Sequence, residues 1–432
     1  FLTSQYLETL DWVTNSQRDR RVRFNEHQGR LYLDMDWADL QAGDFILVEI
    51  SLRQDPTTYT TMFNDNWLKD YVEALFQQQW GRNLSKYDGI QMLGGVTLNG
   101  RQILEDASAR KKELEEEIRD PGDDQVLLKT IYMSLDPYMR GRMNDAKSYA
   151  KAVEIGEVME AGAVSQVIKS KSKNFKEGDF VEGRTGWQDN PTVHEKDLRI
   201  IDPNMAPLST AIGVLGMPGT TAYVGMKNFA KPQSGETLVV SAASGAVGGT
   251  VGQIGKIHGC RVVGIAGSDE KCQFTKTEYG FDDCLNYKDT NFKENLKNSC
   301  PNGVDIYWEN VGGISFDAVM PLFNDYARIP VCGLISYYNL NSLKLDGPDR
   351  VPLLFRQMLT KRLMYKGFIV FNHYDQRQES IEQLSSWIKD GKLKYKEDFI
   401  EGLENASKAF IGLLNGKNFG KLVVKLNDDP TS

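Results

Sequence analysis

The chain has 432 residues, of which 41% are hydrophobic and 25% charged, a composition typical of a globular protein with room for two or three domains. Its net charge of −8 argues against an electrostatic nucleic-acid binder, and no apolar run approaches the ~20 residues that cross a bilayer. Five cysteines without a Cys-x-x-Cys pair and four scattered histidines favour a reduced, cytoplasmic chain and argue against a zinc site.

The first 120 residues combine strand-like and helical patterns and contain no catalytic constellation. GRLYLDMDW alternates as a strand does, and QMLGGVTLNG is typical of a hairpin. One helix is predicted between these two stretches, and the charged stretch RQILEDASARKKELEEEIR predicts a second. The apolar faces are expected to comprise Trp67, Leu68, Tyr71, Val72, Leu75, Phe76 and Trp80 in the first helix, and Ile103, Leu104, Ala107, Leu114 and Ile118 in the second.

The remainder of the chain changes character near residue 215. Before it, the runs QVLLKTIYMSLD, EIGEVMEAGAVSQVIKS and FKEGDFVEGRTGWQ are separated by turn residues, which predicts a β-rich domain. From residue 237, six short β-branched runs alternate with helical stretches, which predicts a doubly wound parallel sheet that binds a dinucleotide. We therefore expect an N-terminal module over 1–119, a β-rich domain over 120–215 and 371–432, and a dinucleotide-binding domain over 216–370.

A run of small residues marks the expected phosphate site. VVSAASGAVGGTVGQIGK, residues 239–256, passes from an apolar strand through small residues into a predicted helix. Ala243, Gly245 and Gly248 fill the three positions that let a pyrophosphate reach the backbone N–H groups at a helix N-terminus. Tight packing of helix on strand, without a ligand, is the alternative.

The next strand ends in GIAGSDEK, which bears on the choice of cofactor. A site for NAD usually carries an acid here to bind the ribose 2′-hydroxyl. This chain has Gly267 and Ser268 followed by Lys271, and a small loop with a cation suits the 2′-phosphate of NADPH. Asp269 and Glu270 also follow the strand, where they could cap the next helix. An exposed helical lysine is the alternative for Lys271.

Several stretches together carry a family resemblance. They are SLDPYMRGRM, GMPGTTAY, AASGAVGGTVGQIGK, GSDEK, NYKD, ENVGG, CGLISYYN, GFIV and GKNFGKLVV. From about residue 121 onward the chain resembles the zinc-independent medium-chain dehydrogenase/reductases, in the branch of prostaglandin reductases, leukotriene hydroxydehydrogenases and NADPH-dependent alkenal or curcumin reductases. The resemblance implies an α/β fold with a Rossmann-type sheet and a partial GroES-like domain, preceded by an unrelated α+β module.

The same resemblance implies an activity and partners. The activity is reduction of the carbon–carbon double bond of an α,β-unsaturated ketone or aldehyde by hydride transfer from NADPH, without a metal. The implied partners are a small enone or enal substrate and a second copy of the chain, paired through the edge of the dinucleotide-binding sheet. A quinone oxidoreductase of the same superfamily is an alternative.

Residue roles follow from the matched motifs. Tyr338 of CGLISYYN would donate a hydrogen bond to the substrate carbonyl, and Tyr138 of DPYM would line the substrate cleft; packing is the alternative for both. Loops around Trp187 and 338–348 are expected to set specificity. The positions implied to contact NADPH are Thr221, Ala243, Gly245, Ala246, Val247, Gly248, Lys271, Tyr287, Asn310, Cys332, Gly333, Ile335, Ser336, Phe368, Val370 and Asn418.

The N-terminal stretches carry a second, different resemblance. FNEHQGRLYLDMDW, GDFILVE and YTTMFNDNWLKDYVEALFQQQWGRNLSKYDGIQMLGGVTLNGRQILEDA resemble neck or head-completion proteins of contractile-tailed bacteriophages, which implies virion proteins as partners. The opening strands of the reductase family's β-rich domain are absent, and such a loss exposes unpaired strand edges. Two readings stay open: an enone reductase with a foreign N-terminal module, or a virion structural chain with an inert reductase part. A chimeric gene would explain the combination.

Overall fold

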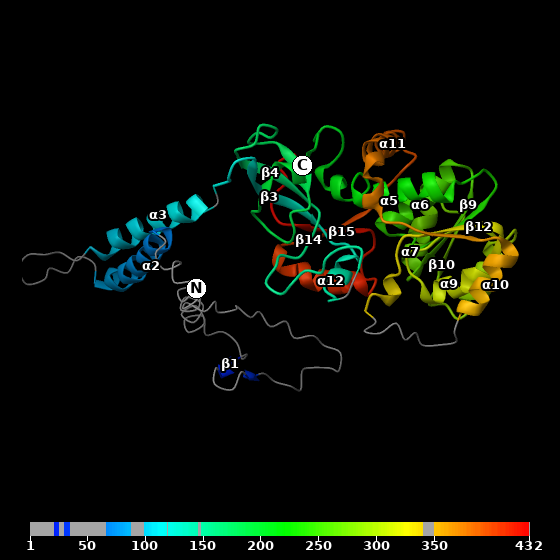
Figure 1. Cartoon of the computed structure of the whole chain (residues 1–432), viewed down its shortest axis with the longest axis horizontal. Coiled ribbons are helices and arrows are strands. Elements are labelled where there is room, and N and C mark those ends of the chain that lie inside the picture. Colours follow the sequence, from blue (N-terminus) through cyan, green and yellow to red (C-terminus); the bar gives the residue numbers. More distant parts are fainter. Residues whose placement is uncertain are drawn as a thin grey trace, which may run out of the picture. The chain divides into compact units, whose positions relative to one another are not determined.

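The computed structural model describes residues 21–25, 30–34, 66–87, 99–118, 120–145, 148–339 and 350–431. The chain divides into two compact units, Phe1–Asp120 and Pro121–Ser432 (Figure 1). No helix in the described part of the chain is both long and apolar enough to cross a membrane.

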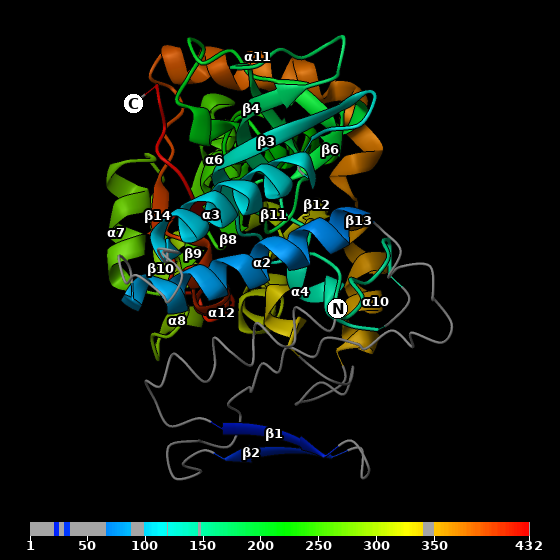
Figure 2. The same ribbon diagram turned by 90° about the vertical axis from the view of Figure 1, so that its left-hand side faces the viewer.

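The described part of the first unit consists of a strand pair and a helix pair. β1 (Arg21–Asn25) and β2 (Arg30–Asp34) are antiparallel, and β2 is the strand predicted from GRLYLDMDW. The predicted helices are present as α2 (Asn66–Leu84) and α3 (Gly100–Ile118), which lie side by side in Figures 1 and 2. Most of the predicted QMLGGVTLNG hairpin, residues 91–98, lies outside the described residues.

The structure corrects the apolar face predicted for α2. Phe76 and Trp80 are 68% and 62% exposed, because the helix turns its small residues Ala74 and Gly81 inward instead. A Cβ on Gly81 would lie 2.5 Å from the backbone nitrogen of Leu104 in α3, so the two helices approach closely at this point. The contact between the two helices therefore follows the small residues, and the aromatic side chains of Phe76 and Trp80 point outward. In α3, Ala107 and Leu114 are buried as predicted.

The second unit contains the predicted parallel sheet, so the expected fold class is confirmed. Its strands run in the order β10-β9-β8-β11-β12-β13 and every neighbouring pair is parallel. The strands are β8 (Thr237–Ser241), β9 (Arg261–Ala266), β10 (Asp283–Asn286), β11 (Val304–Trp308), β12 (Phe323–Val331) and β13 (Met364–Gly367). All of β8 is buried, as expected for a central strand with both faces covered.

Helices between these strands, and one on either side of them in the chain, cover the sheet (Figure 1). They are α5 (Met217–Gly225), α6 (Ala246–Ile257), α7 (Asp269–Thr277), α8 (Phe292–Ser299), α9 (Gly313–Val319), α10 (Val351–Lys361) and α11 (Arg377–Lys389). α6 packs closely because it is rich in glycine. A Cβ on Gly252, for example, would lie 1.9 Å from Cζ of Phe281 in the core.

A second, mixed sheet completes this unit and brings distant segments together. Its strands are β3 (Gln125–Ser134), β4 (Ala163–Ser170), β5 (Phe180–Gly183), β6 (Thr192–His194), β7 (Leu198–Ile200), β14 (Glu397–Glu401) and β15 (Lys421–Lys425). The order is β14-β15-β3-β4-β5-β7, with β6 also paired to β3. Because β15 is antiparallel to the end of β3, the C-terminal segment with α12 (Ala406–Leu414) lies beside the loop and short helix α4 (Met139–Arg142) that follow β3.

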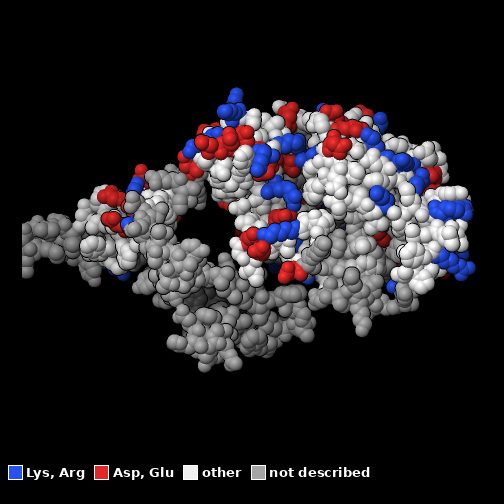
Figure 3. Space-filling view, viewed as in Figure 1, with Lys and Arg blue, Asp and Glu red and all other residues white. Residues whose placement is uncertain are grey.

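Charge on this unit is mixed. On the face shown in Figure 3, acidic and basic side chains are interspersed over its surface. That face provides no single-sign field of the kind that draws in nucleic acid.

Candidate active site

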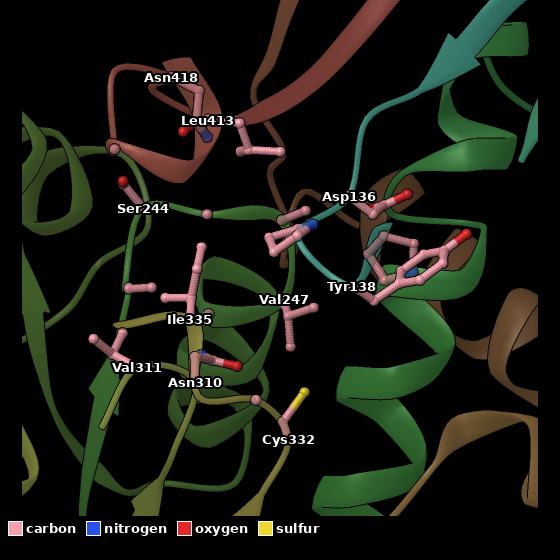
Figure 4. Close-up of a pocket in the computed structure, with 18 of the residues that line it drawn as sticks. Asp136, Tyr138, Ser244, Val247, Asn310, Val311, Cys332, Ile335, Leu413 and Asn418 are labelled. Atoms are coloured by element: carbon pink, nitrogen blue, oxygen red, sulfur yellow. The ribbon is translucent and has the colours of Figure 1, made fainter. Parts of the chain in front are cut away.

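A cavity of about 560 Å³ opens in the second unit where the two sheets meet. One side is formed by loops that follow the carboxyl ends of the parallel strands, where doubly wound folds bind their ligands. Figure 4 shows Val247, Asn310 and Cys332 on that side, and Asp136 and Tyr138 of the loop after β3 across from them.

All but one of the predicted site residues line this cavity. Those that do are Tyr138, Thr221, Gly245, Ala246, Val247, Gly248, Lys271, Tyr287, Asn310, Cys332, Gly333, Ile335, Ser336, Tyr338, Phe368, Val370 and Asn418. The exception is Ala243, which is fully buried in the core, with its backbone nitrogen donating to Ile265 O at 3.0 Å; its contact with a cofactor stays a prediction. Its small side chain packs against Gly264 instead of facing the cavity, because a larger one would push β9 away.

The glycine turn has the shape of a phosphate cradle. The first turn of α6 lines the cavity and has no side-chain cap, so its leading N–H groups are available to an anion. A Cβ on Gly248 would lie 2.2 Å from the carbonyl oxygen of Ala242, a residue held at a φ of 52°. The turn therefore admits only glycine at that position, and its residues fit a pyrophosphate.

One end of the cavity is lined by two lysines, Lys271 and Lys288. Tyr287 also lines it, and Lys271 Nζ donates to Gly416 O at 2.7 Å, leaving further donors. Burial lowers the pKa of Lys271. Ser268, and not Asp269, is the N-cap of α7, and Asp269 accepts from Asn286 Nδ2 at 2.9 Å. The donor set at this end fits a ribose 2′-phosphate.

A buried acid shapes the loop that carries Asn310. One carboxylate oxygen of Glu309 accepts from the backbone nitrogens of Val311 and Gly312 at 2.7 and 2.8 Å. Burial raises the pKa of Glu309. The Asn310 amide is also engaged, since its Nδ2 donates to Ser241 O at 2.7 Å. These contacts make the loop rigid on the cavity side.

The two adjacent tyrosines of CGLISYYN divide their roles. Tyr337 OH accepts from Gly313 N at 2.8 Å and its ring packs on the glycine turn at 312–313, so it is structural. Tyr338 lines the cavity, and its oxygen accepts from Leu334 N at 3.4 Å. Within the described residues its hydroxyl hydrogen has no acceptor. Burial raises the pKa of Tyr338, which keeps it a proton-bearing donor. Burial likewise raises the pKa of Cys332, to about 12, so its thiol is a poor nucleophile.

A buried ion pair between Lys421 and Asp136 lies beside Tyr138, on the side of the cavity formed by the loop after β3. Lys421 Nζ donates to Asp136 Oδ1 at 2.9 Å, to Leu135 O at 2.8 Å and to Ser134 Oγ at 2.6 Å. The Lys421 and Asp136 side chains are 5% and 11% exposed, and both line the cavity. The pair ties β15 to the loop that carries Tyr138. Burial raises the pKa of Tyr138, so that hydroxyl also keeps its proton.

Other functional candidates were missed by reasoning from the sequence. Tyr149 and Phe371 line the cavity, but neither stands in a motif that marked it. The loop around Trp187 was expected to set specificity. Trp187 itself packs edge-on against Phe410, with ring centroids 6.1 Å apart, and does not line the cavity, so the role of its loop stays a prediction. Most of the other specificity loop, 340–348, lies outside the described residues. Among described side chains, no group of three or more His, Cys, Asp or Glu could hold a metal ion.

A glycine turn, a cationic end and a hydroxyl donor around one cavity define a dinucleotide-binding site with room for a small substrate. Comparison with known families agrees. Residues 106–201 match the family model "N-terminal domain of oxidoreductase" and 246–390 match "Zinc-binding dehydrogenase". Residues 1–131 match "Bacteriophage T4 neck protein gp13", which confirms the second resemblance.

Individual relatives identify the branch. The chain is 51% identical over 316 residues to the NADPH-dependent curcumin reductase of Escherichia coli (73% of this chain, 91% of the relative). It is 43% identical to the NADP⁺-dependent 2-alkenal reductase of Nicotiana tabacum (71% and 88%). The solved structure of CurA from Vibrio vulnificus in complex with NADPH is 52% identical, with a TM-score of 0.69 over 72% of this chain and 92% of that one.

The chain therefore belongs to the medium-chain dehydrogenase/reductase family, in the branch of the curcumin, alkenal and prostaglandin reductases. The Escherichia coli quinone oxidoreductase, at 17% identity and a TM-score of 0.57, shares the fold alone.

Proposed function

We propose that this chain reduces the carbon–carbon double bond of α,β-unsaturated ketones and aldehydes with NADPH. The observation that carries the proposal is the joint lining of one cavity by the glycine turn, the cationic end at Lys271 and the hydroxyl of Tyr338. Relatives named for NADPH-dependent curcumin and 2-alkenal reduction support it.

The residues divide the work between holding the cofactor and polarising the substrate. The N–H groups of Ala246, Val247 and Gly248 would hold the pyrophosphate, and Lys271 with Tyr287 the 2′-phosphate. When bound, NADPH supplies the hydride. Tyr338 donates a hydrogen bond to the carbonyl oxygen of the enone, on which negative charge develops as the β-carbon is reduced. The raised pKa of its phenol keeps that hydrogen in place.

The test is oxidation of NADPH by the whole chain in the presence of 4-phenyl-3-buten-2-one, followed at the cofactor's absorbance. We expect turnover that depends on the enone, with Tyr338→Phe slower by about 10²-fold, the usual effect of removing one oxyanion donor. Tyr337→Phe is the matched control and should retain most activity. Turnover of quinones without turnover of enones would favour the quinone alternative, and no turnover with any substrate would refute the proposal.

A second candidate function concerns the N-terminal part alone. We propose that α2 and α3 belong to an assembly module, supported by the match of residues 1–131 to a phage neck protein and by the outward Phe76 and Trp80. Light scattering on the whole chain and on a Phe76→Ser/Trp80→Ser variant tests it. Self-association that the variant abolishes supports the proposal, and a monomer in both cases contradicts self-assembly.

A further inference from the structure

An arginine is buried behind two of the tyrosines that line the cavity. Arg142, at the end of α4, is only 1% exposed. Its Cζ lies 4.6 Å from the ring centroid of Tyr149 and 5.5 Å from that of Tyr138. Its Nε donates to Glu160 Oε2 at 3.1 Å, while its Nη2 is buried without a hydrogen-bond partner among the described residues. The two rings are therefore a large part of what this cation contacts.

A second arginine repeats the arrangement at the neighbouring part of the wall. Arg184 Nη2 donates to the same oxygen, Glu160 Oε2, at 2.6 Å. Its Cζ lies 4.9 Å from the ring centroid of Phe371. Unlike the buried Arg142, Arg184 is 46% exposed. One carboxylate thus orients two guanidinium groups; that of Arg142 contacts two aromatic rings and that of Arg184 contacts one.

The supported rings share one location. Tyr138, Tyr149 and Phe371 all line the cavity; we call them the aromatic wall. Tyr138 comes from the loop after β3, Tyr149 from the segment after α4 and Phe371 from the segment after β13. Val153 N donates to Arg142 O at 2.8 Å, which joins the Tyr149 segment to α4, whereas among the described residues no backbone hydrogen bond joins either of them to the Phe371 segment. Side-chain contacts must therefore hold the three rings in position relative to one another.

We propose that Glu160 is a positioning residue for substrate binding: through its two arginines it holds the aromatic wall against which a planar, bulky enone packs. A cation behind a ring fixes that ring by cation–π attraction, which is strongest where the cation is desolvated, as Arg142 is. Fixed rings offer a preformed surface for stacking and spare the substrate the cost of ordering them. The inference rests on the proposed enone reduction and assigns no chemical step to Glu160.

Steady-state kinetics of the whole chain at saturating NADPH test the inference with two enones, 4-phenyl-3-buten-2-one and the small 3-buten-2-one. For Glu160→Gln we expect KM for the phenyl enone to rise about five- to tenfold, equivalent to losing one or two ring–cation contacts. The kcat, the Kd of NADPH and KM for the small enone should each change less than about twofold, since these do not depend on the wall.

Matched variants separate positioning from general damage. Glu236→Gln removes the carboxylate from another part-buried ion pair, with Arg328, that does not line the cavity, and it should leave both KM values unchanged. Arg142→Lys keeps a cation and should be milder than Arg142→Met. If Glu160→Gln cannot be purified folded, Arg184→Met removes the exposed support of Phe371, leaves the bond between Arg142 and Glu160 in place, and should still raise KM for the phenyl enone.

Several results would overturn the proposal. They are an equal rise in KM for both enones, a fall in kcat at unchanged KM, or the same effect from Glu236→Gln. If the unaltered chain turns over neither enone, the proposed function fails but the positioning role is still measurable. The Kd of the phenyl enone for the chain with NADP⁺, read by quenching of protein fluorescence, should then be weaker for Glu160→Gln, and an unchanged Kd would refute the role.

Discussion

Replacing Lys421 by methionine should destabilise the second unit strongly. The lysine is 5% exposed and donates three hydrogen bonds, one of them to Asp136, which is 11% exposed. Removing one partner of a buried pair leaves the other charge without compensation, at a cost of about 3–5 kcal/mol. The unit spans Pro121–Ser432, so at about 2.1 cal/mol/K per residue its unfolding entropy is about 0.7 kcal/mol per kelvin. The melting temperature should therefore fall by about 5–8 °C.

The assay is thermal unfolding followed by near-ultraviolet circular dichroism, with two companion variants. Lys421→Met/Asp136→Asn removes both charges and should recover at least half of the loss, because no buried charge is left unpaired. Lys392→Met breaks an exposed pair with Asp390, 57% and 49% exposed, and should shift the melting temperature by less than about 1 °C. A Lys421→Met shift as small as that of Lys392→Met, or a double variant no better than the single, would refute the reasoning.

Three further predictions concern the cofactor and the donor. Lys271→Ala should weaken NADPH binding about ten- to a hundredfold while changing NADH binding less than about twofold, measured by fluorescence titration; equal losses would contradict a 2′-phosphate contact. Gly248→Ala should abolish NADPH binding or folding, because its Cβ would lie 2.2 Å from Ala242 O, whereas Gly245→Ala, at 3.3 Å, should be tolerated; the reverse order would contradict the cradle. Because burial raises the pKa of Tyr338 above 10, its protonated form persists in weak alkali, so kcat/KM should show no loss from this group between about pH 6 and 9; a fall near pH 8 that Tyr338→Phe removes would contradict this.

The parts of the fold that depend on local pattern were predictable. The glycine turn predicted both the strand before it and the helix after it, because only small residues allow a strand, a tight turn and a helix to follow one another so closely. Gly245 and Gly248 line the cavity as expected. Ala243 does not line the cavity, because its small side chain packs against Gly264, and a sequence does not say which neighbour, Gly264 or a ligand, a small residue faces.

The parts that depend on distant segments meeting in space were not predictable. The face of α2 is set by Gly81 against Leu104, a contact that no helical periodicity in one segment reveals. In the sequence, Glu160 resembles an ordinary surface acid. The proposed positioning role depends on its contacts with Arg142, which precedes it in the chain, and Arg184, which follows it, and only the folded structure shows these contacts. Tyr149 joins the wall for the same reason.

The place of β15 in the mixed sheet has a consequence for how the protein is made. β15 fills the edge of β3 near residues 132–134, yet nearly two hundred residues separate β7 from β14. At about 5–20 residues per second, translation of these residues takes roughly 10–40 s, and during this time the edge of β3 has no partner strand. During this interval the parallel sheet can fold first, while the half-built mixed sheet offers a bare strand to any neighbouring nascent chain. Production of this protein should therefore be unusually sensitive to translation speed and to chaperone supply.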